Sequence, residues 1–421
     1  MCTTALKTDG RIFTEINPDS VTGADIVAGI LSHNNMDNIK LSLEKVAGGL
    51  RKYYPDLKGV VVNSDCFSQD DTRDLFLNSA AGVPRIYVST PPDQNLKKNS
   101  FFNLMEVAQR LEPKVVLAFD ARISTVKTSW VPRLAEPVLK NGASYTAPIY
   151  SRQFFDTPVT YLLTYPMFRA VFGRRIRHPN LGDAAFSGSL NRELLENTSW
   201  PTEDNYAACE LTMQVKAVRH GPVFQSFMGD PRVGHVRRPI DAGVAAEFRA
   251  NLKSLYELME LYPEIWLKVR NSRPTPILGT DLKPEILPPR DLTITPESAG
   301  NMIREIARQS EPFWAKHFPE HAGLLENLKK LPLESLDVDP EIWVKIIYKG
   351  ALIFRGLDCE GRTALALSVT PLFLARLFKF HQLTRSLNSA QLLSLIEDEA
   401  MVFEKYKADL SFGWKSMDGK I

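Results

Sequence analysis

An aspartate that directly follows a short apolar run is the first candidate for chemistry. Residues 115–119, Val-Val-Leu-Ala-Phe, have the character of a buried strand, and Asp120 comes next. In a parallel sheet, the carboxyl end of a strand faces the crevice that binds ligands, and a carboxylate there can hold a cation on a diphosphate. An aspartate at this place can equally cap a turn, and spacing alone gives each interpretation about half the weight.

Two further segments carry polar side chains before predicted helices. Residues 63–72, Asn-Ser-Asp-Cys-Phe-Ser-Gln-Asp-Asp-Thr, form an acidic, hydroxyl-rich stretch that suits hydrogen bonds to a ribose or a base. Acidic residues at a helix start are also good caps, so both interpretations stand. Lys97, in the segment Leu-Lys-Lys-Asn, could meet a phosphate, although a solvated charge is the commoner role of an isolated lysine.

A basic loop and two isolated residues complete the candidates. Residues 173–183, Gly-Arg-Arg-Ile-Arg-His-Pro-Asn-Leu-Gly-Asp, combine cations with a glycine that lets a ligand approach the backbone, which favours a phosphate or acceptor loop. A surface loop with solvated arginines is an alternative of roughly equal weight. Glu210 lies in a helix-like stretch and His235 follows a turn, and residue type alone selects neither of them as functional.

Four apolar runs that alternate with predicted helices would position these side chains. The runs cover residues 25–31, 59–62, 85–89 and 114–119, and polar residues follow them. This alternation predicts an α/β fold with a doubly wound, mainly parallel sheet. Because the carboxyl ends of parallel strands lie at one edge of a sheet, we expect the polar residues after them to meet there.

The pattern changes from about residue 246, where helix-spaced apolar residues dominate. At 421 residues the chain exceeds what one compact core usually holds. We therefore predict two domains, a nucleotide-binding domain over residues 22–245 and a mainly helical domain over residues 246–421. The predicted helices of the second part cover residues 246–261, 296–309, 341–354, 371–383 and 388–406.

Composition narrows the classes of protein. Hydrophobic residues make up 44% and charged residues 24% of the chain, which is typical of a soluble globular protein. The formal net charge of +2 gives no general attraction to nucleic acid. The four cysteines lie far apart without a CxxC pair, which argues against a zinc knuckle or a disulfide framework and favours a reducing cytoplasm. We also expect no signal peptide and no membrane span.

Taken in order, these segments resemble the glucosylglycerate and glucosyl-3-phosphoglycerate synthases, and more distantly mannosylglycerate synthase, which are glycosyltransferases of the GT-A fold. The similarity covers about residues 24–280, and the helical C-terminal part agrees more loosely. It rests on the order of the motifs rather than on any one of them. The matching segments are residues 29–35, 63–65 with Ser68 and Thr72, the segment of Lys97, Asp120, and residues 147–150, 161–166, 169–173, 176–183, 186–187 and 233–235.

The resemblance implies a retaining transfer of a hexose from a nucleoside diphosphate sugar to a small hydroxy acid such as glycerate or 3-phosphoglycerate. It implies that the donor is bound by Leu31, His33, Asn35, Asp65, Lys97 and Asp120. It implies that the acceptor is bound by Arg177, Gly182 and Asp183, and that Glu210 and Asp120 act at the reacting centre. Asp120 and His235 would hold a divalent cation, Mg²⁺ or Mn²⁺, and relatives suggest a homodimer.

The sequence departs from the family pattern at the strand end. The Asp-x-Asp motif of the resembling enzymes here reads Asp120-Ala-Arg122, and their Gly-Lys-Gly segment reads Leu-Lys-Lys at residues 96–98. The segment Asp-Gly-Thr-Ile-Thr-Asn reads Asp-Thr-Pro-Val-Thr-Tyr at residues 156–161. Three explanations compete. Arg122 replaces the cation electrostatically, the donor or acceptor differs, or catalysis is lost and binding is kept.

Two other classes of protein compete with the transferase. A non-catalytic sugar-nucleotide-binding regulator or scaffold on the same fold would share every feature above, and the altered motif favours it. A nucleotidyltransferase would show a glycine-rich phosphate loop after its first strand. Residues 31–35, Leu-Ser-His-Asn-Asn, lack such a loop, so this alternative ranks below the other two.

Overall fold

The computed structural model describes residues 4–8, 11–91, 98–153, 158–180, 182–196, 198–202, 206–233, 242–279, 286–287 and 296–418. The chain divides into two compact units, and each is built from three segments. The first, here the sheet unit, comprises Met1–Arg152, Ile176–Val236 and Thr275–Glu285. The second, here the helical unit, comprises Gln153–Arg175, Arg237–Pro274 and Ile286–Ile421. The boundary between residues 245 and 246 remains a prediction from sequence.

A mixed, mostly parallel sheet forms the centre of the sheet unit, with strand order β1-β2-β5-β4-β3-β6-β9-β7-β10-β12. Strands β5, β4, β3 and β6 run parallel, as do β7, β10 and β12, and β9 joins the two groups by antiparallel pairing. The strands are β1 (Thr4–Thr8), β2 (Arg11–Ile16), β3 (Ile26–Ser32), β4 (Gly59–Asp65), β5 (Arg85–Ser89), β6 (Val115–Asp120), β7 (Tyr145–Gln153), β9 (Ala184–Ser187), β10 (Val223–Pro231) and β12 (Ile277–Leu278). The predicted doubly wound, mainly parallel sheet is confirmed.

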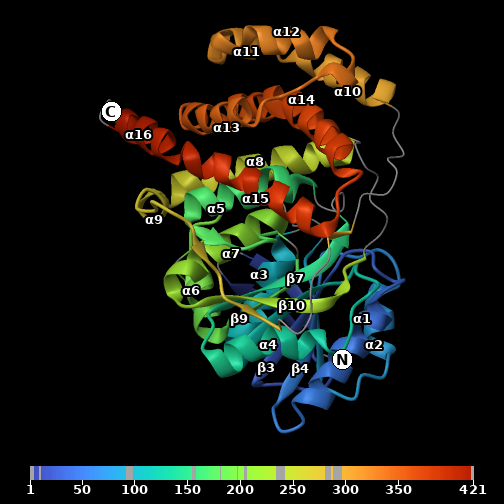
Figure 1. Ribbon diagram of the computed structural model, residues 1–421. Coiled ribbons are helices and arrows are strands. Elements are labelled where there is room, and N and C mark those ends of the chain that lie inside the picture. The colour runs from blue at the N-terminus through green and yellow to red at the C-terminus, as the bar shows by residue number, and fades with distance from the viewer. Residues whose placement is uncertain are drawn as a thin grey trace. The chain divides into compact units, whose positions relative to one another are not determined.

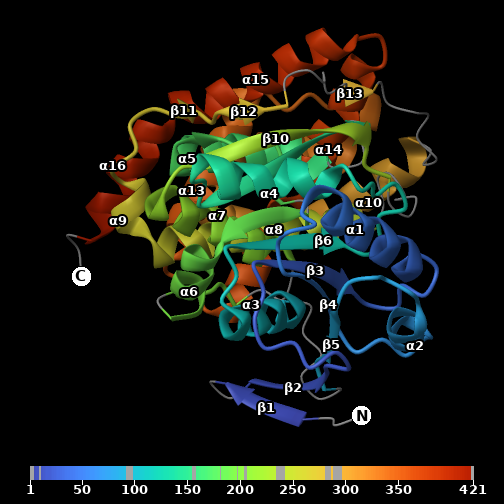
Figure 2. The ribbon, with the colours of Figure 1, turned by 90° about the horizontal axis from the view of Figure 1, so that it is seen from below.

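Helices cover both faces of this sheet (Figure 2). On one face, α1 (Ile39–Tyr53) and α4 (Trp130–Asn141) pack over the core strands, and on the other α3 (Asn99–Leu111) packs beside α6 (Gly188–Glu196). The remaining helices of the unit are α2 (Thr72–Asn78) and α7 (Tyr206–His220). Gly29 on β3 permits the close approach of α3, because a Cβ there would lie 2.3 Å from a methyl carbon of Leu104.

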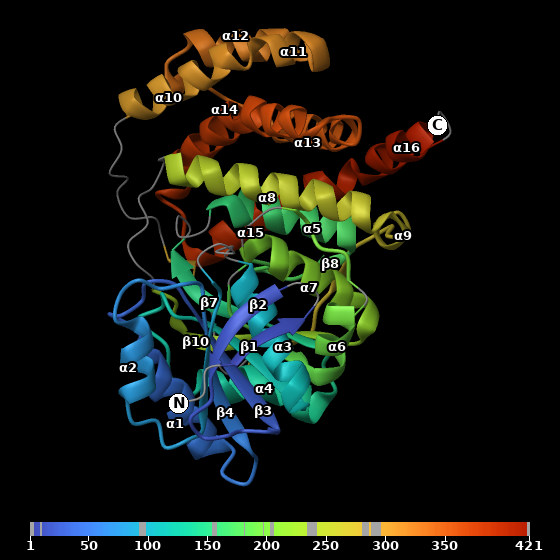
Figure 3. The same ribbon diagram turned by 180° about the vertical axis from the view of Figure 1, so that it is seen from behind.

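The helical unit stacks its helices in successive layers (Figures 1 and 3). Helix α14 contacts α8, α10, α11 and α13, and α15 packs against α5. The helices are η3 (Thr160–Thr164), α5 (Tyr165–Phe172), α8 (Ala242–Leu261), α9 (Pro263–Trp266), α10 (Pro296–Gln309), α11 (Glu311–His317), η4 (Pro319–His321), α12 (Ala322–Lys330), η5 (Leu333–Ser335), α13 (Pro340–Phe354), α14 (Cys359–Thr384), α15 (Ser389–Lys405) and α16 (Lys407–Asp418). Short strands are β8 (Arg174–Arg175), which pairs with β11 (Arg273–Pro274), and β13 (Ile286–Leu287).

Helix α14 begins earlier in the sequence than predicted. It begins at Cys359 rather than at Pro371, because the helix continues through the proline instead of starting there. It is also long and apolar enough, by length and composition, to cross a membrane, although no such segment was expected. In this structure 78% of its most apolar stretch is buried, and the core helix of a soluble protein can be equally long and apolar.

Candidate functional site at the carboxyl edge of the sheet

The carboxyl ends of the strands bring three predicted site residues into register. The pairing of β3 with β6 sets Leu31 opposite Asp120, and the pairing of β3 with β4 sets Ser32 opposite Asp65. Asp183 directly precedes β9, the antiparallel neighbour of β6. Asp65 and Asp120 are the last residues of their strands, and Asp183 immediately precedes one. All three side chains are buried.

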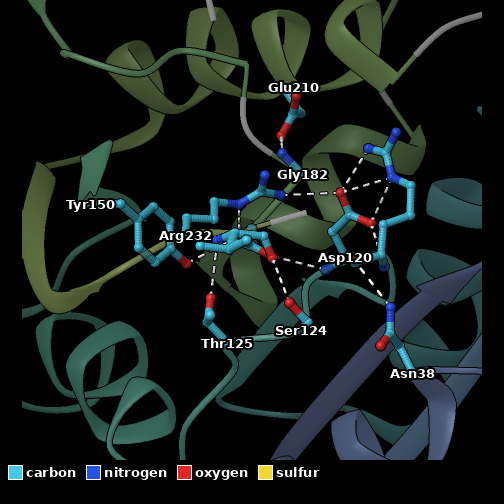
Figure 4. Close-up of polar contacts among 11 residues, drawn as sticks. Asn38, Asp120, Ser124, Thr125, Tyr150, Gly182, Glu210 and Arg232 are labelled. Carbon is cyan, nitrogen blue, oxygen red and sulfur yellow. Dashed lines mark hydrogen bonds and ion pairs between the residues drawn. The ribbon is translucent and has the colours of Figure 1, made fainter. Parts of the chain in front are cut away.

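Asp120 makes two arginine contacts that occupy both of its carboxylate oxygens (Figure 4). Arg122 Nε lies 2.9 Å from Oδ1 and Nη2 lies 2.7 Å from Oδ2, while Arg232 Nη2 lies 3.1 Å from Oδ2. The backbone N–H of Arg122 donates to Oδ1 as well, at 2.9 Å. Burial acts to raise the pKa of Asp120, but the Arg122 guanidinium, followed by that of Arg232, holds this pKa well below its usual value.

Arg232 also joins Asp120 to Asp183. Its Nε donates to Asp183 Oδ2 at 2.8 Å, and the Tyr150 hydroxyl donates to the same oxygen at 3.0 Å. Asp183 Oδ1 accepts the backbone N–H of Asp120 at 2.8 Å, so this carboxylate fixes the end of β6. Burial acts to lower the pKa of Arg232, but Asp183 and Asp120 outweigh it and raise this pKa above its usual value. We call Asp120, Arg122, Asp183 and Arg232 the charged cluster.

Sequence reasoning missed Arg232. Residues 229–234, Gly-Asp-Pro-Arg-Val-Gly, look like a turn, yet β10 continues to Pro231 and delivers Arg232 to the carboxyl edge. The available signal was the apolar start of the strand at residues 223–228. An arginine at the end of such a run can be placed by the same argument that placed Asp120.

Glu210 on α7 contacts the cluster through Gly182. Its Oε1 accepts the backbone N–H of Gly182, and its side chain is buried. Burial raises the pKa of Glu210 to about 8; the Gly182 N–H and Arg232 act against this shift, and Asp183 and Asp120 add to it. The carboxyl group is therefore mostly protonated near neutral pH.

Asp65 organises the loop that follows β4. Its Oδ1 accepts from Ser32 Oγ and Ser68 Oγ, both at 2.6 Å, and its Oδ2 accepts from the Ser68 backbone N–H at 2.6 Å and the Tyr87 hydroxyl at 3.1 Å. Asp65 is fully buried, with both oxygens engaged. It therefore shapes the loop in this structure, and its predicted contact with a nucleoside remains a prediction.

The predicted donor-binding residues at the end of β3 and directly after it lie beside this loop. Asn35 is buried, and its Oδ1 accepts the backbone N–H of His33 at 2.8 Å, while its own N–H donates to Thr72 Oγ1 at 2.8 Å. The exposed His33 bonds through Nδ1 to the carbonyl of Cys66 at 2.6 Å. Leu31 is buried at the end of the strand. The structure therefore brings Leu31, His33 and Asn35 next to the Asp65 loop.

A cavity of about 510 Å³ adjoins the Asp65 loop. Its lining includes Phe67, Ser68, Gln69, Arg73 and Tyr87. Another cavity, of about 580 Å³, lies at the amino ends of β3 and β4, away from the predicted site. Asp120 lines neither of these two cavities.

Two predicted residues, Lys97 and His235, lie outside the described residues. Arg177 is half-buried, and its backbone N–H donates to Gln225 Oε1 at 2.7 Å. Its predicted contact with an acceptor remains a prediction.

The described residues do not fit a divalent cation at Asp120. Among them, no group of three or more His, Cys, Asp or Glu side chains could hold a metal ion. The oxygens of Asp120 and Asp183 are already bonded to guanidinium and other donors. Arg122 stands where the second carboxylate of an Asp-x-Asp motif would lie.

Comparison with known proteins gives structural similarity only. No family model matches the sequence, and no curated protein does. Among solved structures, the chain is similar to Mycobacterium tuberculosis glucosyl-3-phosphoglycerate synthase in complex with phosphoglyceric acid, at 20% identity over 55% of this chain and 79% of that chain, with a TM-score of 0.41. The same enzyme in complex with Mn²⁺, UDP-glucose and phosphoglyceric acid is 18% identical over 55% of this chain and 79% of that chain, with a TM-score of 0.42. In complex with Mg²⁺ and UDP it is 19% identical over 57% of this chain and 80% of that chain, with a TM-score of 0.43. At these values the similarity does not assign a role to any residue of this chain.

Proposed function

We propose that this chain is a glycosyltransferase that moves a hexose from a nucleoside diphosphate sugar to a small hydroxy acid such as glycerate or 3-phosphoglycerate, with retention of configuration. The observation that carries the proposal is the convergence of Asp120, Asp183 and Arg232 beside Gly182 at the carboxyl edge of a mainly parallel sheet. The order of the motifs along the sequence supports it independently.

The donor would bind along the ends of β3, β4 and β6. His33 and the loop that Asp65 organises would contact the nucleoside, because they lie together at the ends of β3 and β4. Leu31 and Asn35 would line the buried part of this pocket, since both side chains are buried. Lys97 would meet the nucleotide.

The reacting centre would lie next to the charged cluster. A departing diphosphate needs positive charge, which Arg122 and Arg232 provide. Glu210 would act at the reacting centre and hold Gly182 there, because its Oε1 accepts the Gly182 N–H and its carboxyl, with a pKa of about 8, is mostly protonated at neutral pH. Gly182, Asp183 and Arg177 would face the acceptor, whose hydroxyl must be held close to the anomeric carbon.

A radiolabelled transfer assay tests the proposal. The purified protein would be incubated with UDP-, GDP- or ADP-glucose or mannose and with glycerate or 3-phosphoglycerate. We expect one donor to give a labelled hexosyl product, and NMR of its anomeric proton to show the donor's configuration. Arg192→Ala, exposed on α6, is the control that should keep activity. Absence of transfer from every donor that binds would contradict a transferase with these acceptors.

A second candidate is a sugar-nucleotide-binding protein without catalysis. The observation that favours it is the engagement of both Asp120 oxygens by arginines, which leaves the altered motif without its usual metal ligands. This candidate predicts nucleotide binding without hydrolysis or transfer. The same assay therefore separates the two.

The proposal also covers the oligomeric state and the cellular location of the protein. We propose a cytoplasmic homodimer that binds neither nucleic acid nor membrane. Light scattering coupled to size-exclusion chromatography would test the dimer, and cell fractionation would test the location. Recovery in the membrane fraction would contradict it and direct attention to α14.

A further inference from the structure

We infer that an arginine pair takes the place of a divalent metal in this site: Arg232 is the fixed cation, and Arg122 is the exchangeable cation that leaves Asp120 to bind the donor diphosphate. This inference rests on the proposed function and deepens it. It makes nucleotide binding by this chain independent of divalent metal.

The position of Arg232 is fixed from its backbone to its guanidinium. The Thr125 hydroxyl donates to the carbonyl of Pro231 at 2.7 Å and accepts the N–H of Val233 at 3.0 Å, so the chain is held on both sides of Arg232 (Figure 4). The Ser124 N–H and hydroxyl both donate to the carbonyl of Val233. The Arg232 side chain is only 7% exposed and bridges two buried carboxylates.

The four side chains of the charged cluster, taken among the residues that the structure describes, carry balancing charges. Asp120 and Asp183 supply two negative charges, and Arg122 and Arg232 supply two positive charges. The raised pKa of Glu210, due first to burial, keeps that carboxyl mostly neutral near pH 7. A divalent cation on either aspartate would have to displace a guanidinium and remain beside it, where like charges repel strongly.

Arg122 differs from Arg232 in its freedom to exchange partners. Its side chain is 46% exposed, although it makes the shortest ion-pair contact to Asp120. When this side chain moves to a diphosphate, Asp120 keeps the backbone N–H of Arg122 at 2.9 Å and Arg232 Nη2 at 3.1 Å. The buried carboxylate therefore stays paired, and the planar guanidinium can meet two phosphate oxygens at once.

Gly182 allows a ligand to come close to Asp120 and Arg232. Its φ of +86° lies in the left-handed region, and a Cβ there would lie 3.4 Å from Asp120 Oδ2 and 3.6 Å from Arg232 Nη2. The absence of a side chain leaves room beside both groups.

The first experiment measures nucleotide and metal binding without using activity. Titration calorimetry would measure the affinity for UDP, GDP and ADP, and for their nucleosides, in EDTA and in Mn²⁺. Mn²⁺ itself would be followed by its EPR signal. We expect the affinity of the best nucleoside diphosphate to change by less than about threefold between the two conditions, and Mn²⁺ to remain free. Tightening by about tenfold or more in Mn²⁺, or stoichiometric Mn²⁺ binding to the protein, would overturn the inference.

The second experiment tests the exchangeable cation. Arg122→Ala should weaken the nucleoside diphosphate about tenfold or more and leave the nucleoside unchanged, and Arg122→Lys should restore part of the loss. Arg192→Ala is the matched control, and a thermal denaturation scan of each variant reports folding. An unchanged ratio of diphosphate to nucleoside affinity in Arg122→Ala would overturn the role of Arg122.

The outcomes separate this inference from the proposed function. If a nucleotide sugar binds and is transferred only with Mn²⁺, the function stands and the arginine pair is wrong. If no nucleoside diphosphate binds under either condition, both are wrong.

Discussion

Buried arginines occur in both units of the molecule, but their surroundings differ. In the helical unit, Arg169 on α5 bonds to Glu397 and Glu404 of α15, and Arg376 on α14 bonds to Glu399 of α15. In the sheet unit, Arg232 bonds to Asp120 and Asp183. In both units an arginine bridges elements that are distant in sequence.

The difference lies in the groups around each ion pair. The partners of Arg169 are partly exposed, with Glu397 at 43% and Glu404 at 26%, so their charges remain in contact with water. The sheet unit surrounds its pair with a second arginine, a glycine at positive φ and a glutamate with a pKa near 8. A buried ion pair alone therefore does not indicate a functional site, whereas a pair beside an exposed second arginine and a carboxyl of shifted pKa is a candidate for one.

The largest expected effect is on transfer activity, which should depend on the charged cluster of the sheet unit and not on an exposed side chain of the helical unit. Asp183→Ala removes the acceptor of the Asp120 N–H, the Tyr150 hydroxyl and Arg232 Nε, so the end of β6 and the fixed cation both lose support. We expect transfer to fall about 10³-fold or more, because pre-organised charge supplies a large part of catalysis. Asp409→Ala, exposed on α16, is the control and should leave kcat/KM unchanged. A variant that folds and keeps full activity would remove the distinction between the regions.

The helical pair should behave as a structural contact. Arg376→Met and Glu399→Leu should each lower the free energy of unfolding by about 3–5 kcal/mol, because each leaves a buried charge behind, while the double variant should be close to neutral. Both side chains are under 10% exposed, at 6% and 9%. Urea denaturation measures the cycle, and calorimetry should show unchanged nucleotide affinity in the double variant. Loss of nucleotide affinity there would mean that the helical pair also serves the site.

The pH dependence of stability should identify Glu210. Folding raises its pKa from 4.5 to about 8, mainly through burial, so the stabilisation from its proton is complete below the unfolded value and is lost as pH rises through the folded value. The free energy of unfolding should therefore fall between pH 4.5 and about 8, by on the order of a few kcal/mol at most. Glu210→Gln should flatten this slope in urea denaturation. An identical slope in the variant would assign the pH dependence to other groups.

The smallest effect tests the space beside the cluster. Gly182→Ala and Gly142→Ala both place a side chain at positive φ, +86° and +67°, and each should cost about 1–2 kcal/mol of stability. A Cβ at Gly142 meets nothing within 4 Å, whereas one at Gly182 approaches Asp120 and Arg232. Only Gly182→Ala should therefore also weaken nucleoside diphosphate binding in calorimetry. Equal binding in both variants would place the ligand elsewhere.

The sequence predicted the elements better than the contacts between them. The position of Asp120 followed from an apolar run of strand length, and the structure ends β6 at that residue. The partner Arg232 lies 112 residues further along the chain, and its strand contains Gly229 and Asp230, which read locally as a turn. Spacing carries no information on such a contact. The start of α14 was missed for the same reason, since tertiary packing keeps Pro371 inside the helix against its local preference.

The segments of the two units alternate along the chain, and this limits how the gene can recombine in evolution. A cut of the polypeptide after residue 245 would separate β12 from its partner β10, and would separate Tyr165 and Arg169 from the glutamates of α15. Each unit would then lack one of its own pieces. We therefore expect the two units to be gained, lost and recombined only together, so that gene fusions preserve the whole chain from β3 to α15.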